Sequence, residues 1–113
     1  MTGTSCTFKS GEIGLADLDQ LPAETEEIVF DATYNPRWEE TIGTLHRFQR
    51  LRRLEMRRNC LQIRSPNLFK QLKGLVELNI SNCHTDAGYN EVNDIGAQSI
   101  ASLTSLTSLV LSR

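Results

Sequence analysis

An apolar pattern that returns about every 24 residues constrains this chain more than any other feature of its sequence. The first copy spans residues 51–59, the second spans 75–83, and a third begins at 106. Their shared apolar positions are Leu51, Leu54 and Met56, then Leu75, Leu78 and Ile80, then Leu106, Leu109 and Leu111. A period in the twenties with this spacing is typical of a solenoid, in which each repeat buries its apolar face against the next. The pattern therefore predicts an α/β repeat array and argues against an active site.

Each repeat is expected to hold one strand and one outer helix. Strands are expected at 53–57, 77–81 and 108–112, with a degenerate one that places Ile28 and Phe30 inward. Apolar residues at steps of three and four predict a helix within 36–50, on Trp38, Ile42, Leu45 and Phe48. Further helices are expected from Ser65-Pro66, with Leu68, Phe69 and Leu72 facing inward, and over about 94–102.

Two parts of the chain are distinguished by this pattern. Residues 21–113 form about four repeats, the last of them incomplete, and residues 1–20 lack the repeat. Within 11–21, the residues Ile13, Leu15, Leu18 and Leu21 suggest a short helix or turn. Because the first apolar layer of a solenoid must be covered, we interpret residues 1–20 as an N-terminal cap. The pattern would place the next turn residue just beyond Arg113, so we expect the array to continue or a partner to cover its last layer.

The third repeat is longer than the second. Leu54 and Leu78 are 24 positions apart, whereas Leu78 and Leu109 are 31 apart. We place the extra residues within 84–92, although 85–88 and 93–96 resemble each other and either could be the original turn. An insertion there lies in the loop that leaves the strand, and loops carry function more often than repeat backbone does.

With these residues considered together, the chain resembles the leucine-rich repeat proteins. The stretch 90–111 is similar to the ribonuclease-inhibitor-like subclass, and the ending Ser81-Asn82-Cys83 is similar to the cysteine-containing subclass. The resemblance covers roughly residues 21–113. It implies a curved solenoid with a parallel sheet on the concave face and helices on the convex face. It also implies a protein that binds other proteins and rarely performs chemistry.

The residues between the core positions of each strand are expected to face the concave surface. The candidate partner-binding residues there are Arg53, Glu55, Arg57, Glu77 and Asn79, joined by Tyr89 in the 84–92 loop. Neighbouring parallel strands would put Arg53 between Glu27 and Glu77, and Arg57 beside Asp31. Two interpretations stay open: a polar docking face, or a ladder of surface charges that neutralise one another. Tyr89 is either an exposed anchor for a partner or a residue that folds the loop onto the repeats.

Residues 47–58 are rich in arginine, which raises the question of nucleic-acid binding. The arginines are Arg47, Arg50, Arg52, Arg53, Arg57 and Arg58. Phosphate binding needs positive charge that is not neutralised, and the expected neighbours include Glu27, Asp31 and Glu77. The arginines also divide between a helix end and a strand, so they do not form one stripe. Nucleic acid is therefore disfavoured, and an acidic protein partner, or an RNA already held in an assembly, would use the same arginines.

Catalysis, metal binding and cofactor binding find little support in the sequence. His46 has no nucleophile or acid that the pattern places nearby, and His84 stands only beside Cys83 and Asp86. The three cysteines are scattered outside any metal-ligand spacing, and no glycine-rich phosphate loop is present. We expect neither an enzyme nor a cofactor.

The composition adds an expectation about location. An odd number of cysteines suits free thiols in a reducing compartment, and no signal peptide or membrane-spanning segment is evident. We expect a cytoplasmic protein whose formal charge of −2 indicates no partner class.

The leading functional expectation is a protein-interaction scaffold that binds another protein through the concave face and the 84–92 loop. A second is a structural subunit or capping segment of a larger assembly, docked through the open C-terminal edge. A third is the substrate-recognition part of an effector or ubiquitin-ligase-type protein whose catalytic domain lies elsewhere.

Overall fold

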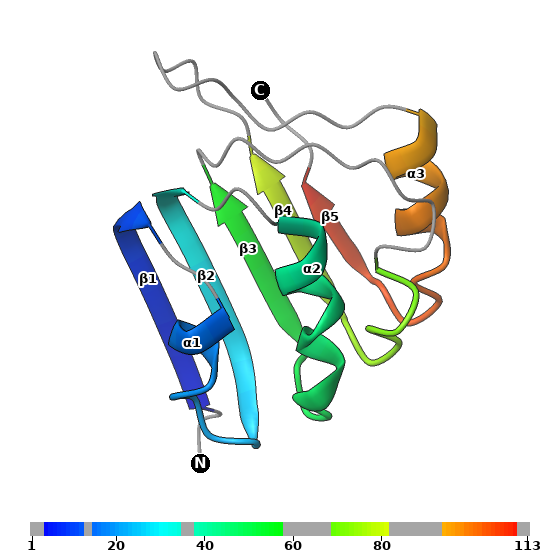
Figure 1. Ribbon diagram of the computed structural model, residues 1–113. Helices are drawn as coiled ribbons and strands as arrows, with labels where there is room; N and C mark the ends of the chain where they lie inside the picture. The colour runs from blue at the N-terminus through cyan, green and yellow to red at the C-terminus, as the bar shows by residue number, and fades with distance from the viewer. Residues whose placement is uncertain (1–3, 13–14, 35–37, 58–68, 82–93, 111–113) are drawn as a thin grey trace.

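The computed structural model is built on one parallel sheet whose strands lie in the order of the chain (Figure 1). It describes residues 4–12, 15–34, 38–57, 69–81 and 94–110. The strands are β1 (Thr4–Glu12), β2 (Thr25–Tyr34), β3 (Arg53–Arg57), β4 (Glu77–Ser81) and β5 (Ser108–Val110). Every pair of neighbours is parallel, so the chain must cross back between strands each time. Sequential parallel strands of this kind are consistent with a repeat-like arrangement.

Short helices occupy the connections between strands. They are α1 (Leu15–Leu18), α2 (Trp38–Gly43), the 3₁₀ helix η1 (Leu45–Arg47) and α3 (Asp94–Ala101). Figure 1 shows α1 and α2 over the same side of the sheet, with α3 beside β5. The start of the helix expected from Ser65-Pro66 and its Leu68 lie outside the described residues. Phe69 and Leu72 are buried as expected, but they lie in a turn and not in a helix.

Two in-register rows of apolar side chains form the core beneath these helices. The first row is Cys6, Ile28, Leu54, Leu78 and Leu109, and the second is Phe8, Phe30, Met56 and Ile80. Residues from the connections close over both rows, namely Leu18, Ile42, Leu45, Phe48, Leu51, Phe69, Leu72, Leu75, Ile100 and Leu103. Each strand thus contributes one residue to each row, beside the matching residues of its neighbouring strands. The 24-residue pattern predicts this packing.

Hydrogen bonds outside the sheet join elements that are far apart in the chain. The Ser99 hydroxyl in α3 accepts a hydrogen bond of 2.8 Å from the backbone N–H of Phe69, and both residues are fully buried. At the lower end of the sheet in Figure 1, the backbone N–H of Arg52 donates to the Glu26 carbonyl, and that of Val76 donates to the Arg52 carbonyl. Successive turns are therefore stacked beside one another as the strands are.

Most of the expected strands and helices are confirmed. The strands at 53–57 and 77–81 have the expected bounds, and α3 ends within one residue of the expected helix. The helix expected within 36–50 is shorter, because the chain leaves α2 at Gly43 and continues as the 3₁₀ helix η1. For the strand expected at 108–112, the described part ends at Val110.

The two ends of the sheet differ in how well they were anticipated. Residues Thr4–Glu12 form a strand, although the sequence indicated no strand in the segment interpreted as a cap. Leu109 belongs to the core row as expected, and it is 44% exposed because no described strand lies beyond β5, which agrees with the open edge expected at the last repeat. In the described part of the chain, no helix is long and apolar enough to cross a bilayer.

Candidate functional site

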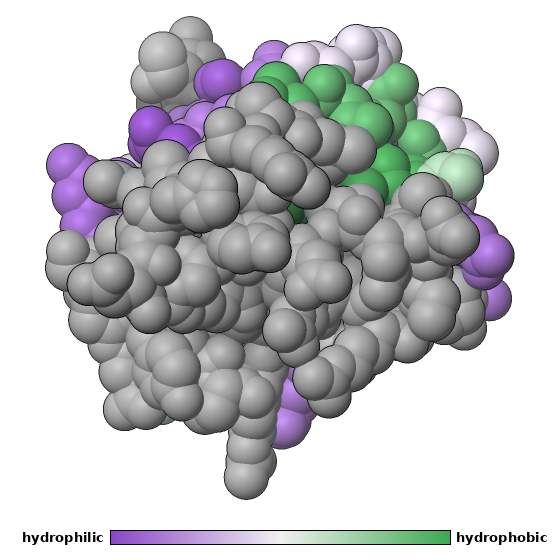
Figure 2. All heavy atoms as spheres, turned by 90° about the horizontal axis from the view of Figure 1, so that it is seen from above, coloured by the Kyte–Doolittle hydropathy of each residue, from purple (hydrophilic) through white to green (hydrophobic). Residues whose placement is uncertain are grey.

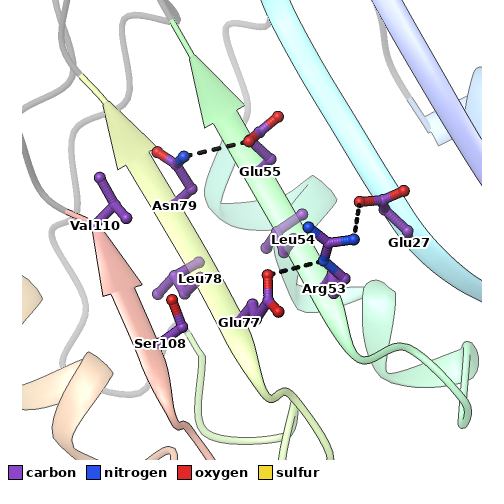
Figure 3. A pocket seen from close by; sticks show the side chains of 9 residues that line it. All are labelled: Glu27, Arg53, Leu54, Glu55, Glu77, Leu78, Asn79, Ser108 and Val110. Atoms are coloured by element: carbon purple, nitrogen blue, oxygen red, sulfur yellow. Dashed lines mark hydrogen bonds and ion pairs between the residues drawn. The ribbon is translucent and has the colours of Figure 1, made fainter.

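The face of the sheet opposite α2, which we call the open face, carries the candidate binding residues (Figure 3). Its side chains form three in-register rows across the strands. The first row is Ser5, Glu27, Arg53, Glu77 and Ser108; the second is Thr7, Val29, Glu55, Asn79 and Val110; the third is Lys9, Asp31 and Arg57. This arrangement follows from strand geometry, because residues that alternate with core positions must project from the other side of the sheet.

The first row is a chain of paired polar groups. Arg53 lies between two carboxylates, with Nε 2.9 Å from Glu77 Oε2 and a terminal nitrogen 3.2 Å from Glu27 Oε2. The Ser5 hydroxyl donates a hydrogen bond of 2.7 Å to Glu27. The expected position of Arg53 between Glu27 and Glu77 is confirmed. One guanidinium shared by two carboxylates leaves this row with a surplus of negative charge.

The second and third rows are linked through Glu55. Its carboxylate accepts a hydrogen bond of 3.2 Å from the Asn79 amide, and it lies 3.1 Å from Arg57 Nη2. Arg57 also stands opposite Asp31 in the register, as expected. The Arg53 and Arg57 side chains are about half exposed, so each of these ion pairs contributes at most about 1 kcal/mol to stability.

A shallow hollow of about 130 Å³ lies over β3 and β4 on the open face. Its lining comes from the first two rows, with Val110 as the exposed apolar side chain, and from the strand positions of Leu54 and Leu78, whose side chains are buried on the core side. Figure 3 shows Glu27, Arg53 and Glu77 on one side of it and Glu55 with Asn79 on the other. The hollow offers carboxylate and amide oxygens as acceptors, and the Arg53 guanidinium and Asn79 amide as donors.

Exposure differs along the open face. Val29 and Asp31 on β2 are buried, whereas Arg53 is exposed and Glu77 and Asn79 are half-buried. At the β5 end, Leu109 and Val110 are the large hydrophobic residues that remain exposed among those described. Figure 2, viewed from above, shows hydrophobic atoms gathered toward the side of β5, with hydrophilic atoms on the side of β1 and also at the opposite edge. On the open face the exposed residues are therefore polar over β3 and β4, and β5 adds Ser108 and the apolar Val110. The exposed Leu109 belongs to the core row on the other side of β5.

Five of the six candidate residues are brought together by the sheet. Arg53, Glu55 and Arg57 come from β3, and Glu77 and Asn79 from β4. Tyr89 and the 84–92 loop lie outside the described residues. Sequence reasoning missed the residues that β1 adds to the face. The alternation of Ser5, Thr7 and Lys9 with Cys6 and Phe8 is a strand signal, but it lacks the leucines that marked β3, β4 and β5.

The site shows little that could perform chemistry. Cys6 is the described thiol, and it projects to the core side in register with Ile28. Burial raises the pKa of the Cys6 thiol above its ordinary value, which disfavours the reactive thiolate. His46 is exposed, and its Nδ1 donates a hydrogen bond of 2.7 Å to the Gly43 carbonyl. Among the residues with described positions, no group of His, Cys, Asp or Glu is arranged to hold a metal ion; Cys83 and His84 lie outside them.

Comparison of the chain with protein-family models, with curated proteins and with solved structures finds no match. What the chain can bind is therefore argued from its own surface.

Proposed function

We propose that this chain is a protein-interaction module of the leucine-rich repeat type, which binds another protein through the open face of its sheet. The repeat spacing in the sequence and the sequential parallel strands support this assignment. The observation that carries it is the hollow over β3 and β4, lined by side chains that successive strands hold in register. Sheet faces of repeat proteins are extended surfaces suited to binding, since a partner can contact several repeats at once.

The test compares two charge reversals of the same size. Glu77→Lys places a cation beside Arg53 in the hollow, whereas Glu24→Lys changes an exposed turn residue outside the open face. Both proteins would be used for affinity capture from a lysate of the source cells, with bound proteins identified by mass spectrometry. A partner that is retained by the wild type and by Glu24→Lys but lost by Glu77→Lys supports the proposal. A partner set that is the same for all three proteins contradicts it, provided that their thermal unfolding curves agree.

A second candidate function is a structural subunit that docks through β5. The observation that favours it is the exposure of Leu109 and Val110, one on each side of the same terminal strand. Unpaired strand edges with exposed apolar residues are templates for association. Analytical ultracentrifugation of the wild type and of Leu109→Glu tests it. A self-association that the substitution abolishes supports docking through β5, and a monomeric wild type contradicts such docking between copies of the chain.

A further inference from the structure

The turns that precede β3 and β4 carry positive charge with no negative charge among them. These turns, residues 44–52 and 69–76, are here called the basic turn edge. Their charged residues are Arg47, Arg50, Arg52, Lys70 and Lys73, and all of them are exposed. Neither segment contains a carboxylate, although the chain as a whole has a formal charge of −2. The basic turn edge is therefore positively charged, although the chain as a whole carries a net negative charge.

The backbone holds the two turns side by side. The N–H groups of Val76 and Glu77 donate to the Arg52 carbonyl at 2.7 and 3.0 Å. The Arg52 guanidinium reaches across and donates a hydrogen bond of 3.3 Å to the Gly74 carbonyl. A side chain at Gly74 would begin 2.7 Å from that guanidinium, so glycine leaves room for the arginine over the second turn. Cations from both turns thus lie on one surface.

A hollow of about 180 Å³ opens within this surface. Phe48, Leu51 and Leu72 form its apolar lining, and all three are almost fully buried, so that only their edges reach it. Gln49, Gln71 and Lys73 are exposed residues that also line it. The hollow could receive one apolar side chain of a ligand, with the amides of Gln49 and Gln71 and the Lys73 ammonium around its opening.

The charges of the basic turn edge are not neutralised as those of the open face are. Arg47 is the exception, because its guanidinium lies 2.7 Å from Asp19 and stacks over the Phe48 ring. Within the described ranges, Arg50, Arg52, Lys70 and Lys73 have no ion pair with a carboxylate. Four unpaired cations on two adjacent turns attract an anionic group. No ion pair that the structure describes within the chain has to break when such a group binds to them.

The neighbouring turns limit what that anion can be. The turn before β2 carries Asp19 and Glu24, and Glu26 follows at the start of β2; the turn before β5, residues 102–107, carries no charge. A long polyanion that ran along the stacked turns would meet the carboxylates before β2. Nucleic acid also lacks a stacking platform here, since Phe48 is only 3% exposed. A short anionic segment with an apolar residue fits both limits.

We propose that the basic turn edge binds a short acidic segment of a partner protein. Glutamate or aspartate side chains of that segment pair with Arg50, Arg52, Lys70 and Lys73. An apolar side chain between them enters the hollow over Phe48, Leu51 and Leu72. This surface is separate from the open face, so the inference stands whether or not the open face binds a partner.

The test is a binding titration followed by fluorescence anisotropy. The probe is a labelled peptide of glutamates with a central leucine, and the matched control replaces every glutamate by glutamine. The wild type is expected to bind the glutamate peptide and not the glutamine peptide. Raising the salt concentration from about 50 to 200 mM should weaken the binding, because the charges are exposed. Equal binding of the two peptides would overturn the proposal.

Matched variants locate the site. Lys73→Glu is expected to weaken binding by about fivefold or more, whereas Lys9→Glu, an equal change on the exposed part of β1, should alter it less than about twofold. Gly74→Ala, which displaces the Arg52 guanidinium without changing any charge, should weaken binding by a smaller factor. Equal effects of Lys73→Glu and Lys9→Glu would contradict the assignment.

Two further readouts keep the result independent of the variants. Backbone amide shifts of the wild type, followed by NMR during the peptide titration, are expected to change within 44–52 and 69–76. Changes confined to the open face would overturn the site. A labelled oligouridylate serves as the nucleic-acid probe, and tighter binding of this RNA than of the glutamate peptide would overturn the choice of partner.

Discussion

The middle and the end of the sheet bury the same kind of residue to very different extents. Leu54, Leu78 and Leu109 occupy the same core row, yet the first two are 1% exposed and the third is 44% exposed. Leu54 and Leu78 have a strand on each side, whereas among the described strands Leu109 has only β4 beside it. The comparison shows that burial in this fold comes from the neighbouring layers and that the residue type alone does not secure it.

The largest expected effect is the difference between two truncations in that row. Leu78→Ala should lower the free energy of unfolding by about 3 kcal/mol, because it removes a fully buried side chain and leaves a cavity. Leu109→Ala should lower it by less than about 1 kcal/mol, since much of that side chain is already exposed. Urea unfolding followed by circular dichroism measures both. Equal losses would show that the last layer is covered in solution.

A smaller loss is expected from the hydrogen bond that links α3 to the turn at Phe69. Ser99→Ala removes the acceptor of the buried Phe69 N–H and should cost about 1–2 kcal/mol of stability. Ser105→Ala, at an exposed position near the same end of the chain, is the matched control and should be neutral within about 0.5 kcal/mol. Similar thermal stability of Ser99→Ala and the wild type would mean that another acceptor replaces the hydroxyl.

The ion pairs of the open face should contribute still less to the free energy of unfolding. Arg53→Ala breaks the pairs with Glu27 and Glu77 but is expected to lower the free energy of unfolding by no more than about 1 kcal/mol. The difference from the wild type should shrink further as salt is added, because these charges are exposed. A loss as large as that of Leu78→Ala would show that the charge ladder, and not the core, holds these strands together.

The smallest effect concerns Cys6, at the opposite end of the same core row. Burial raises the pKa of the Cys6 thiol above its ordinary value of 9.0. The folded protein therefore favours the neutral thiol, and the associated stability is present below pH 9.0 and is lost as the pH rises through the folded pKa. The stability difference between the wild type and Cys6→Ser should change in that range. A constant difference from neutral pH to about pH 10 would show that the thiol is solvated like a free one.

The residues of the candidate site could be predicted from the sequence on those strands whose positions could themselves be predicted. The leucines at 54 and 78 set the register, and alternation then places Arg53 against Glu77 and Glu55 against Asn79. The contribution of β1 could not be predicted in this way, because Cys6 and Phe8 stand where β3 and β4 carry leucine, isoleucine or methionine. Phe8 nevertheless stacks on Phe30, with ring centroids 5.5 Å apart, and so extends the core by one strand.

The basic turn edge shows the limit of reasoning along the chain. The arginines of 47–58 were recognised as a group, but of those described Arg53 and Arg57 pair with carboxylates on the open face, whereas the other three lie in the turn. Lys70 and Lys73 join the turn arginines only because the backbone of Val76 bonds to Arg52 and stacks the two turns. The separation of the charges into a paired set and an unpaired set could not be read from their order.

The sequence by itself determined the α/β class, the parallel strands β3 and β4 and the polar rows on their open face. It could do so because side-chain alternation and a 24-residue period depend only on local geometry. Tertiary structure alone decided that residues Thr4–Glu12 join the sheet, that Leu109 remains exposed and that two turns combine their cations. Each of these depends on which element lies beside another, and burial and electrostatic energy are properties of such neighbours.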